Sequence, residues 1–235
     1  MKSIRLDGRS LSRAHLVMVA HGAPVDLDEG ALQAVARAAD FLAEQVRREE
    51  PIYGVSTGFG SNADRLLGAR PLRDDLPGAT PSNRSLHEEL QVNLIVTHAV
   101  CVGEPLPADV VRAMLCIRIN TLLRGHSGIR VSTLQALTAL LNSGIVPVVP
   151  ALGSVGASGD LAPLSHLAIV LLGGGEAFID GERMPGAEAL KRAGLEPVTL
   201  SYKEGLALNN GTAALTGLGS LALIDALQLA KPADV

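Results

Sequence analysis

Apolar residues recur along most of this chain at the three- and four-residue spacing of amphipathic helices. The first such face consists of Leu32, Val35, Leu42 and Val46. Asp26 or Asp28 stands where it could cap this helix, and Pro51 follows its expected end near residue 50. The same spacing predicts further helices over residues 85–102, 107–125, 132–142, 160 or 161 to 172, 186–194 and 204–230, with Ser132 as the cap of the helix over 132–142. The pattern therefore predicts a mainly α-helical fold.

Strand signals are few and short. Residues 3–6 alternate between polar and apolar before an Asp-Gly turn, so residues 1–27 are expected to form a short strand or an extended lead. Residues 176–184 are typical of a small β-hairpin that turns at Asp180 and Gly181. Residues 61–84 are polar, contain three prolines and predict a loop, whose length is unusual unless it is functional.

Composition narrows the class of protein. Hydrophobic residues make up 47% of the chain but aromatic ones only 2%, which favours closely packed helices with a core of Ala, Leu and Val. A net charge of −4 and the lack of a basic patch argue against a nucleic-acid partner. No metal-ligand spacing occurs: His87 and Glu88 begin like a zinc motif, but residue 91 is Gln. We therefore expect no metal site.

The cysteines and the termini indicate a cytoplasmic protein. Cys101 and Cys116 both lie in apolar helical patterns, which favours buried free thiols over a disulfide. Residues 1–13 are polar and basic and lack the apolar core of a signal peptide. Residues 206–224 carry no charge and by length could span a bilayer, but the polar run 209–212 is costly in lipid. We expect this segment to pack within a helical bundle, and we expect no membrane partner.

A glycine-rich stretch, residues 153–166, has the sequence GSVGASGDLAPLSH and matches none of the common glycine motifs. A phosphate-binding Walker loop needs Lys after its last glycine, where this chain has Asp160. A hydrolase nucleophile elbow needs glycine at that same position. Dinucleotide loops read G-x-G-x-x-G, whereas the glycines here are spaced G-x-x-G-x-x-G.

The triplet Ala157-Ser158-Gly159 has another chemical possibility. In a tight bend the amide nitrogen of Gly159 can attack the carbonyl carbon of Ala157, and loss of water closes a five-membered ring. Dehydration of Ser158 then leaves an exocyclic methylidene. The product is the electrophile 4-methylideneimidazol-5-one (MIO), which needs no external cofactor. Glycine suits the attacking position because it tolerates strained backbone angles.

Three stretches together resemble the MIO-dependent aromatic amino acid ammonia-lyases and aminomutases, a family that includes histidine ammonia-lyase. They are GASGDLAPLSH at residues 156–166, YGVSTGFG at 53–60 and LALNNGT at 206–212. The resemblance implies the N-terminal MIO domain of the L-aspartase-like ammonia-lyase fold, with a small β-hairpin and the start of the central helical bundle. It divides the chain into an MIO-bearing domain, 1–203, and the first long helix of that bundle, 204–235.

The same resemblance implies roles for individual residues. Ala157, Ser158 and Gly159 would form the MIO group, and Asn210 would bond to that group and to the substrate. Tyr53 would be a general base on a loop that closes over the substrate, with the backbone of Gly60 against the substrate; the alternative is a surface turn in which Tyr53 only packs. Residues 90–99 resemble the family's selectivity helix, where His98 is either a substrate contact or a satisfied core histidine.

The implied reaction removes ammonia from an aromatic or heteroaromatic L-α-amino acid such as histidine, tyrosine or phenylalanine. Return of ammonia to the β-carbon would instead make the protein a 2,3-aminomutase, and loss of the chemistry would leave a non-catalytic scaffold subunit. Family members continue into a second helical half that this sequence lacks. We therefore expect a tetramer-like homo- or hetero-oligomer with a chain that carries the C-terminal half.

Overall fold

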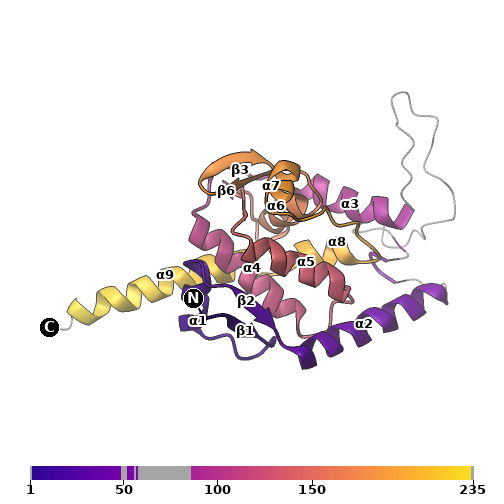
Figure 1. The fold of residues 1–235 in the computed structure, drawn as a ribbon, viewed down its shortest axis with the longest axis horizontal. Coiled ribbons are helices and arrows are strands. Elements are labelled where there is room, and N and C mark those ends of the chain that lie inside the picture. Colours follow the sequence, from indigo (N-terminus) through magenta and orange to yellow (C-terminus); the bar gives the residue numbers. More distant parts are fainter. Residues whose placement is uncertain (1, 49–51, 56, 58–85, 234–235) are drawn as a thin grey trace.

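The computed structural model describes residues 2–48, 52–55, 57 and 86–233 and is mainly helical, as predicted (Figure 1). Its helices are α1 (Arg13–Ala20), α2 (Glu29–Arg47), α3 (Leu86–His98), α4 (Ala108–Leu122), α5 (Val131–Asn142), α6 (Leu161–Leu171), α7 (Gly186–Arg192), α8 (Glu204–Asn209) and α9 (Ala213–Ala233). Its strands are β1 (Ile4–Leu6), β2 (Val25–Leu27), β3 (Val102–Pro105), β4 (Val146–Pro147), β5 (Pro150–Leu152), β6 (Glu176–Ile179) and β7 (Glu182–Pro185).

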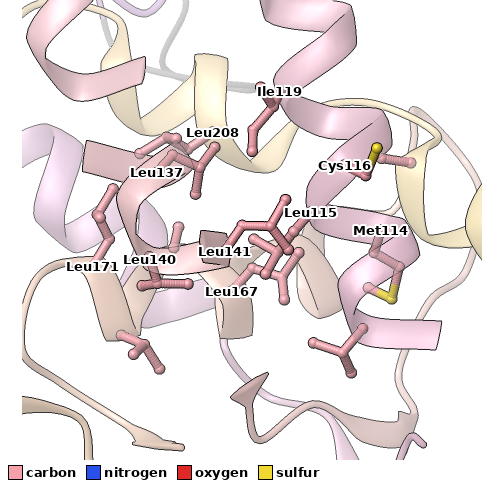
Figure 2. Packing of buried hydrophobic residues seen from close by; sticks show 14 of the residues in the cluster. Met114, Leu115, Cys116, Ile119, Leu137, Leu140, Leu141, Leu167, Leu171 and Leu208 are labelled. Atoms are coloured by element: carbon pink, nitrogen blue, oxygen red, sulfur yellow. The ribbon is translucent and has the colours of Figure 1, made fainter. Parts of the chain in front are cut away.

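Helix α4 is the centre of the core. It packs against α1, α5 and α9, and ten of its fifteen residues are buried. Figure 2 shows leucines of α5, α6 and α8 gathered beside Leu115 and Ile119 of α4, with no aromatic ring among the labelled side chains. Small aliphatic side chains let these helices approach closely. The core thus holds α6 and α8, which flank the glycine-rich motif and the Asn-Asn-Gly-Thr run.

The strands form three small sheets at the edges of the helical body. Strands β1 and β2 are parallel, β3 pairs with β5 antiparallel, and β4, β6 and β7 form an antiparallel sheet in that order. The β6–β7 hairpin turns at Asp180 and Gly181, both with positive φ (52° and 81°), as a two-residue turn of the I′ type requires. The predicted hairpin is therefore confirmed, and β4 extends it on one side.

Several predicted helix limits were wrong for identifiable reasons. Residues 13–20 are helical and not extended, because the Ser12 side chain accepts a hydrogen bond from the amide of His15 and caps α1. Helix α3 ends at His98, since the following residues pair with β5. Helix α5 begins at Val131, so Ser132 lies inside it and is not its cap.

The predicted single helix over 204–230 is broken in two. Asn210 has extended backbone angles (φ −99°, ψ 108°) and ends α8, and α9 begins three residues later. Together, α8 and α9 (204–233) are the one stretch of the described chain that is long and apolar enough to cross a membrane by length and composition; 17% of its apolar window is buried. Beyond its contact with α4, α9 leaves the helical body (Figure 1). Its exposed leucines are Leu215, Leu218, Leu223, Leu227 and Leu229.

Both cysteines are free and buried, as predicted. Cys116 lies in the core of α4, where burial raises its thiol pKa to about 12. Cys101 follows α3, and burial also raises its pKa. Neither thiol is ionised near neutral pH, so neither is a nucleophile there.

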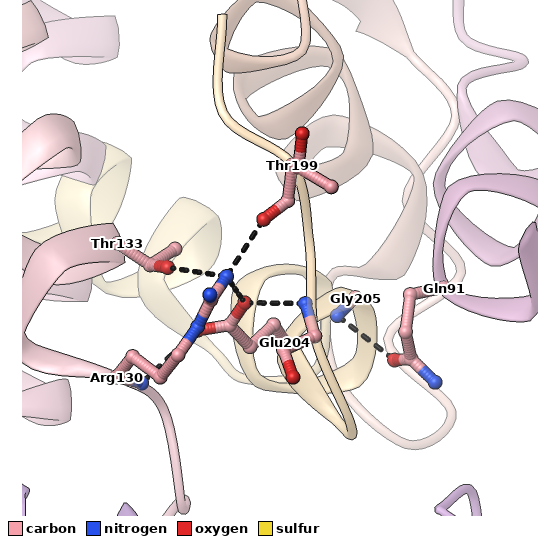
Figure 3. A network of polar contacts seen from close by, with 7 residues as sticks. Gln91, Arg130, Thr133, Thr199, Glu204 and Gly205 are labelled. Carbon is pink, nitrogen blue, oxygen red and sulfur yellow. Dashed lines mark hydrogen bonds and ion pairs between the residues drawn. The ribbon is translucent and has the colours of Figure 1, made fainter. Parts of the chain in front are cut away.

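A buried polar network fixes the start of α8 (Figure 3). The Glu204 carboxylate is 0% exposed and accepts hydrogen bonds from the Arg130 backbone amide (3.0 Å), from Arg130 Nε and Nη2 (3.1 and 2.6 Å), and from the Ser201 amide (2.7 Å). The hydrogen bond with Glu204 raises the pKa of Arg130. Beside it, the Gly205 amide donates to Gln91 Oε1 of α3 at 2.9 Å. Helix α8 is thus held from two sides.

We expect Glu204→Gln to lower the free energy of unfolding by about 3 kcal/mol, since a buried ion pair loses one partner and the new amide group faces N–H donors. Urea denaturation of wild type and variant measures the difference. The matched control is Glu176→Gln, which alters the exposed pair between Glu176 and Arg183 and should change stability little. Equal stability losses in the two variants would contradict the role given to Glu204.

Candidate functional site

The glycine-rich motif forms a segment, residues 153–160, between β5 and α6, which we call the Ala-Ser-Gly strap; its residues 153–158 are exposed. Ala157 and Ser158 are exposed and Gly159 is half-buried. Gly156 and Gly159 have positive φ (63° and 122°), which a residue with a side chain rarely adopts. The strap therefore bends at both ends of the Ala-Ser pair and presents it to solvent.

A second segment, the Asn-Gly-Thr strap (residues 210–212), lies against the first. The Asp160 amide donates to the Gly211 carbonyl oxygen at 2.7 Å. A Cβ on Gly159 would lie 2.8 Å from that same oxygen, so only glycine fits this contact. The two sequence motifs at 156–166 and 206–212 thus meet backbone to backbone.

Asp160 fastens the contact on its other side. Its buried carboxylate accepts hydrogen bonds from Ser154 Oγ (2.9 Å) and from the Leu215 amide (2.8 Å) in the first turn of α9. An acidic group is favourable at that end of a helix. Because the Asp160 amide is committed to Gly211, any support of negative charge by the start of α6 would depend on the amides of Leu161 and Ala162.

The two neighbouring asparagines have different surroundings. Asn209 is fully buried and donates from Nδ2 to Ser165 Oγ of α6 at 3.1 Å. Asn210 is half-buried at the end of α8, and its amide donates to the Leu206 carbonyl at 3.0 Å. Asn209 therefore ties α8 to α6, while Asn210 begins the strap that contacts Gly159.

Tyr53 lies in a turn, residues 53–55, and is 51% exposed. The Gly54 carbonyl accepts from Gln91 Nε2 at 3.3 Å, and the Val55 carbonyl is 3.1 Å from His87 Nδ1, so the turn is attached to α3. Since Gln91 Oε1 also accepts a hydrogen bond from the Gly205 amide, Gln91 links the Tyr53 turn to the start of α8, the helix that ends at the Asn-Gly-Thr strap. Gly60 lies outside the described residues, as does the predicted loop over 61–84.

His98 is the last residue of α3 and is half-buried. Its Nδ1 is 2.8 Å from the Leu94 carbonyl oxygen of its own helix, a contact in which the ring must donate. The hydrogen bond occupies Nδ1 and leaves Nε2 as the other polar atom of the ring. This geometry suits either interpretation of His98, because a core histidine and a substrate contact both need one nitrogen anchored.

His166 connects α6 to the segment after α3. Its Nε2 accepts a hydrogen bond from the Cys101 amide at 3.1 Å, which requires an unprotonated nitrogen. Burial lowers the pKa of His166 below its usual 6.5. The sequence motif contained this residue without indicating any role. In the structure, its hydrogen bond links α6, the helix that follows the Ala-Ser-Gly strap, to the segment that follows His98.

This tie predicts a pH-dependent stability. A histidine with a lowered pKa in the folded state binds its proton more readily when unfolded, so its contribution is fully present above about pH 6.5 and is lost as pH falls below it. We expect His166→Gln, whose amide oxygen can accept from Cys101, to flatten the fall in unfolding free energy between neutral and mildly acidic pH. Urea titrations across that range test it, and an unchanged slope would contradict it.

The residues that position the site were missed from sequence. Gln91, Asp160 and Glu204 are buried polar side chains that join segments distant in the chain. Gln91 and Glu204 stand out in the sequence only as polar residues beside apolar helical patterns, and Asp160 only as part of the glycine-rich motif; none of these signals identifies the partner. No group of three or more His, Cys, Asp or Glu within the described ranges could hold a metal ion.

The fold and site define a class, the helical ammonia-lyases and aminomutases. Residues 11–235 match the model of the aromatic amino acid lyases, and the chain belongs to this family. It is 51% identical along its whole length to histidine ammonia-lyase of Symbiobacterium thermophilum, of which it covers 43%. Over 99% of its length, the chain is similar to the solved structure of tyrosine aminomutase from Streptomyces globisporus, with a TM-score of 0.86 and 35% identity, and it covers 41% of that chain. Over the same share of its length, it is similar to histidine ammonia-lyase from Trypanosoma cruzi, with a TM-score of 0.85 and 36% identity, and it covers 42% of that chain. The chain thus spans less than half the length of the curated relatives it matches.

Proposed function

We propose that this chain supplies the MIO-bearing part of an amino acid ammonia-lyase. The observation that carries the proposal is the contact between the exposed Ala-Ser-Gly strap and the Asn-Gly-Thr strap. This contact joins the segment that carries Ala157, Ser158 and Gly159 to the segment that begins with Asn210, and so supports a shared role for the two segments.

The strap fits formation of the MIO group. The Gly159 amide nitrogen attacks the Ala157 carbonyl carbon, one water leaves as the ring closes, and a second leaves with the Ser158 hydroxyl and its α-hydrogen. Positive φ at both Gly156 and Gly159 favours the tight bend, and the contact with Gly211 restrains it. Once formed, the group supplies an electrophile that makes the substrate amine a better leaving group.

Residues of this chain abstract the proton and position the substrate. Tyr53 takes the β-proton as general base, from a turn that Gln91 holds in place. Asn210 orients the MIO group and the substrate, and Gly60 provides backbone contact to the substrate. His98 contacts the substrate through Nε2, which in the neutral ring accepts a hydrogen bond, because Nδ1 donates to the Leu94 carbonyl.

Histidine is the substrate best supported, because the chain is about 50% identical to histidine ammonia-lyases of two organisms. Tyrosine and phenylalanine remain in the proposed class. The alternative activity is a 2,3-aminomutase, which is favoured by the similarity to the Streptomyces globisporus tyrosine aminomutase. The two differ in whether ammonia is released or returns to the β-carbon.

A complementary C-terminal half completes the proposed enzyme. Residues 1–203 would form the MIO-bearing domain, and 204–235 would begin the central helical bundle of a tetramer-like cytoplasmic assembly. The exposed leucines along α9 support this, since an apolar helix face that leaves the body is expected to be covered in a soluble assembly. No nucleic-acid, membrane or metal partner is part of the proposal.

The test begins with the intact mass of this chain, which should be lower than the sequence mass by two waters. The assembled enzyme from its host is then given histidine, tyrosine and phenylalanine in turn. An α,β-unsaturated acid with free ammonia supports the lyase, and a β-amino acid supports the aminomutase. Full mass together with no turnover on any of the three would overturn the proposal.

A further inference from the structure

Helix α4 carries a buried arginine beneath the candidate site. Arg118 is 5% exposed, and burial lowers its pKa to about 10, with no carboxylate of the described residues offsetting the effect. Arg130, by comparison, has Glu204 as a partner. Burying an arginine without an acid costs free energy, so its retention calls for a specific use of the guanidinium.

The guanidinium of Arg118 meets the segment that carries Asn210. Its Nη2 donates to the Ala207 carbonyl oxygen, one of the last carbonyls of α8 that the helix itself cannot satisfy. A Cβ on Gly211 would lie 2.1 Å from Arg118 Nη1, so the guanidinium occupies space that only glycine leaves at that position. Arg118 therefore touches the chain on both sides of Asn210.

Polar atoms close to these contacts are incompletely satisfied. Arg118 Nε and Asn209 Oδ1 are buried and have no hydrogen-bond partner among the described residues. Unsatisfied buried groups are uncommon in native structures and concentrate where function constrains the fold. Packing stability alone does not account for an arginine in this position, because an apolar side chain of similar length would leave no such orphan donor.

We propose that Arg118 is a positioning residue that sets the Asn-Gly-Thr strap, and with it Asn210, against the Ala-Ser-Gly strap. The guanidinium holds the Ala207 carbonyl and the Gly211 backbone at a fixed spacing, and Gly211 in turn contacts Gly159. Arg118 itself has no contact with Gly159 and acts through the strap. The expected effect of Arg118 on kcat rests on the proposed function. Its expected effect on the position of the Asn-Gly-Thr strap does not.

Kinetics of the assembled enzyme test the consequence. Arg118→Met should lower kcat on the order of 100-fold, the effect of a small misplacement of a catalytic group, with KM nearly unchanged. Gly211→Ala should act similarly, because its methyl group displaces the guanidinium while residue 118 is intact. Arg118→Lys, which keeps the cation and can reach only one of the two contacts, should recover part of kcat.

Arg112 provides a matched control on the same helix. It is also a buried arginine, and it donates to the carbonyls of Val19 (2.9 Å), Leu141 (2.9 Å) and Ala23 (3.4 Å), away from the two straps. Arg112→Met should lower stability and leave kcat near wild type. Equal losses of kcat in the two methionine variants, or no loss in Arg118→Met, would overturn the positioning role.

Hydrogen exchange separates this inference from the proposed function. In the isolated chain, amides 207–213 should exchange faster in Arg118→Met than in wild type, and at the wild-type rate in Arg112→Met. If wild type lacks turnover but shows this difference, the proposed function fails and the positioning role holds. If amides 207–213 exchange alike in all three proteins, the positioning role is wrong whatever the activity.

Discussion

Replacing Ser158 with alanine should abolish turnover, with kcat lowered by roughly 10⁴- to 10⁶-fold, as when a covalent catalytic group is removed from other enzymes. The physical reason is that only a serine at this position can lose its hydroxyl to give the methylidene carbon. Without it the substrate amine stays a poor leaving group. The measurement is kcat of the assembled variant, with the intact mass of the chain, which should no longer show the loss of water from residue 158.

Ser154→Ala is the matched control in the same strap. Ser154 donates to Asp160 at 2.9 Å, so its loss removes a hydrogen bond of the strap without removing any atom of the MIO group. We expect this variant to keep the mass deficit of two waters and most of the wild-type kcat. Substantial turnover by Ser158→Ala would show that the reaction does not use the Ala-Ser-Gly triplet.

The sequence supports a prediction of the site's chemistry but not of how the site is built. The triplet at 157–159 was predicted to cyclise because few residue types allow that reaction, and the role of Asn210 was predicted from a local motif; both stay predictions. The contact between Gly159 and Gly211 was not predictable, since it joins segments more than fifty residues apart and depends on the break between α8 and α9. Helical periodicity continues through that break, so the pattern predicted one long helix.

Fold-level expectations succeeded where local rules decide the structure. The β6–β7 hairpin was predicted because Asp180 and Gly181 tolerate positive φ, and the core helices were predicted from their apolar faces. The prediction failed for α1, because its apolar pattern is too short to indicate a helix and the capping role of Ser12 was not recognised. The buried polar side chains that fix the straps follow from tertiary packing alone.

Helix α8 is short and is held by polar contacts along much of its length. Arg130 holds its first residue, Glu204; Gln91 holds its second, Gly205; and Arg118 holds its fourth, Ala207. A six-residue helix is not stable by itself, so these contacts and the core determine its position. Because Gln91 also binds the Tyr53 turn, two parts of the site far apart in sequence share one support.

Changing Tyr53 to phenylalanine should lower kcat by roughly 10²- to 10⁴-fold, the usual effect of removing a general base. The phenyl ring keeps the shape of the side chain and lacks only the oxygen that accepts the β-proton. Formation of the MIO group uses Ala157, Ser158 and Gly159, so the intact mass of the variant should still be lower by two waters. This combination, a modified chain with little turnover, distinguishes proton abstraction from assembly of the electrophile.

Tyr202→Phe is the matched control, because Tyr202 is the other tyrosine of the chain. The centroid of its ring lies 4.8 Å from that of His87, with a tilt of 60° between the planes, and His87 in turn contacts the Val55 carbonyl of the Tyr53 turn. We expect this variant to retain turnover close to wild type. If Tyr53→Phe also retained it, Tyr53 would be a packing residue of a surface turn, and the base would have to come from outside residues 53–55, either in this chain or in the proposed C-terminal half.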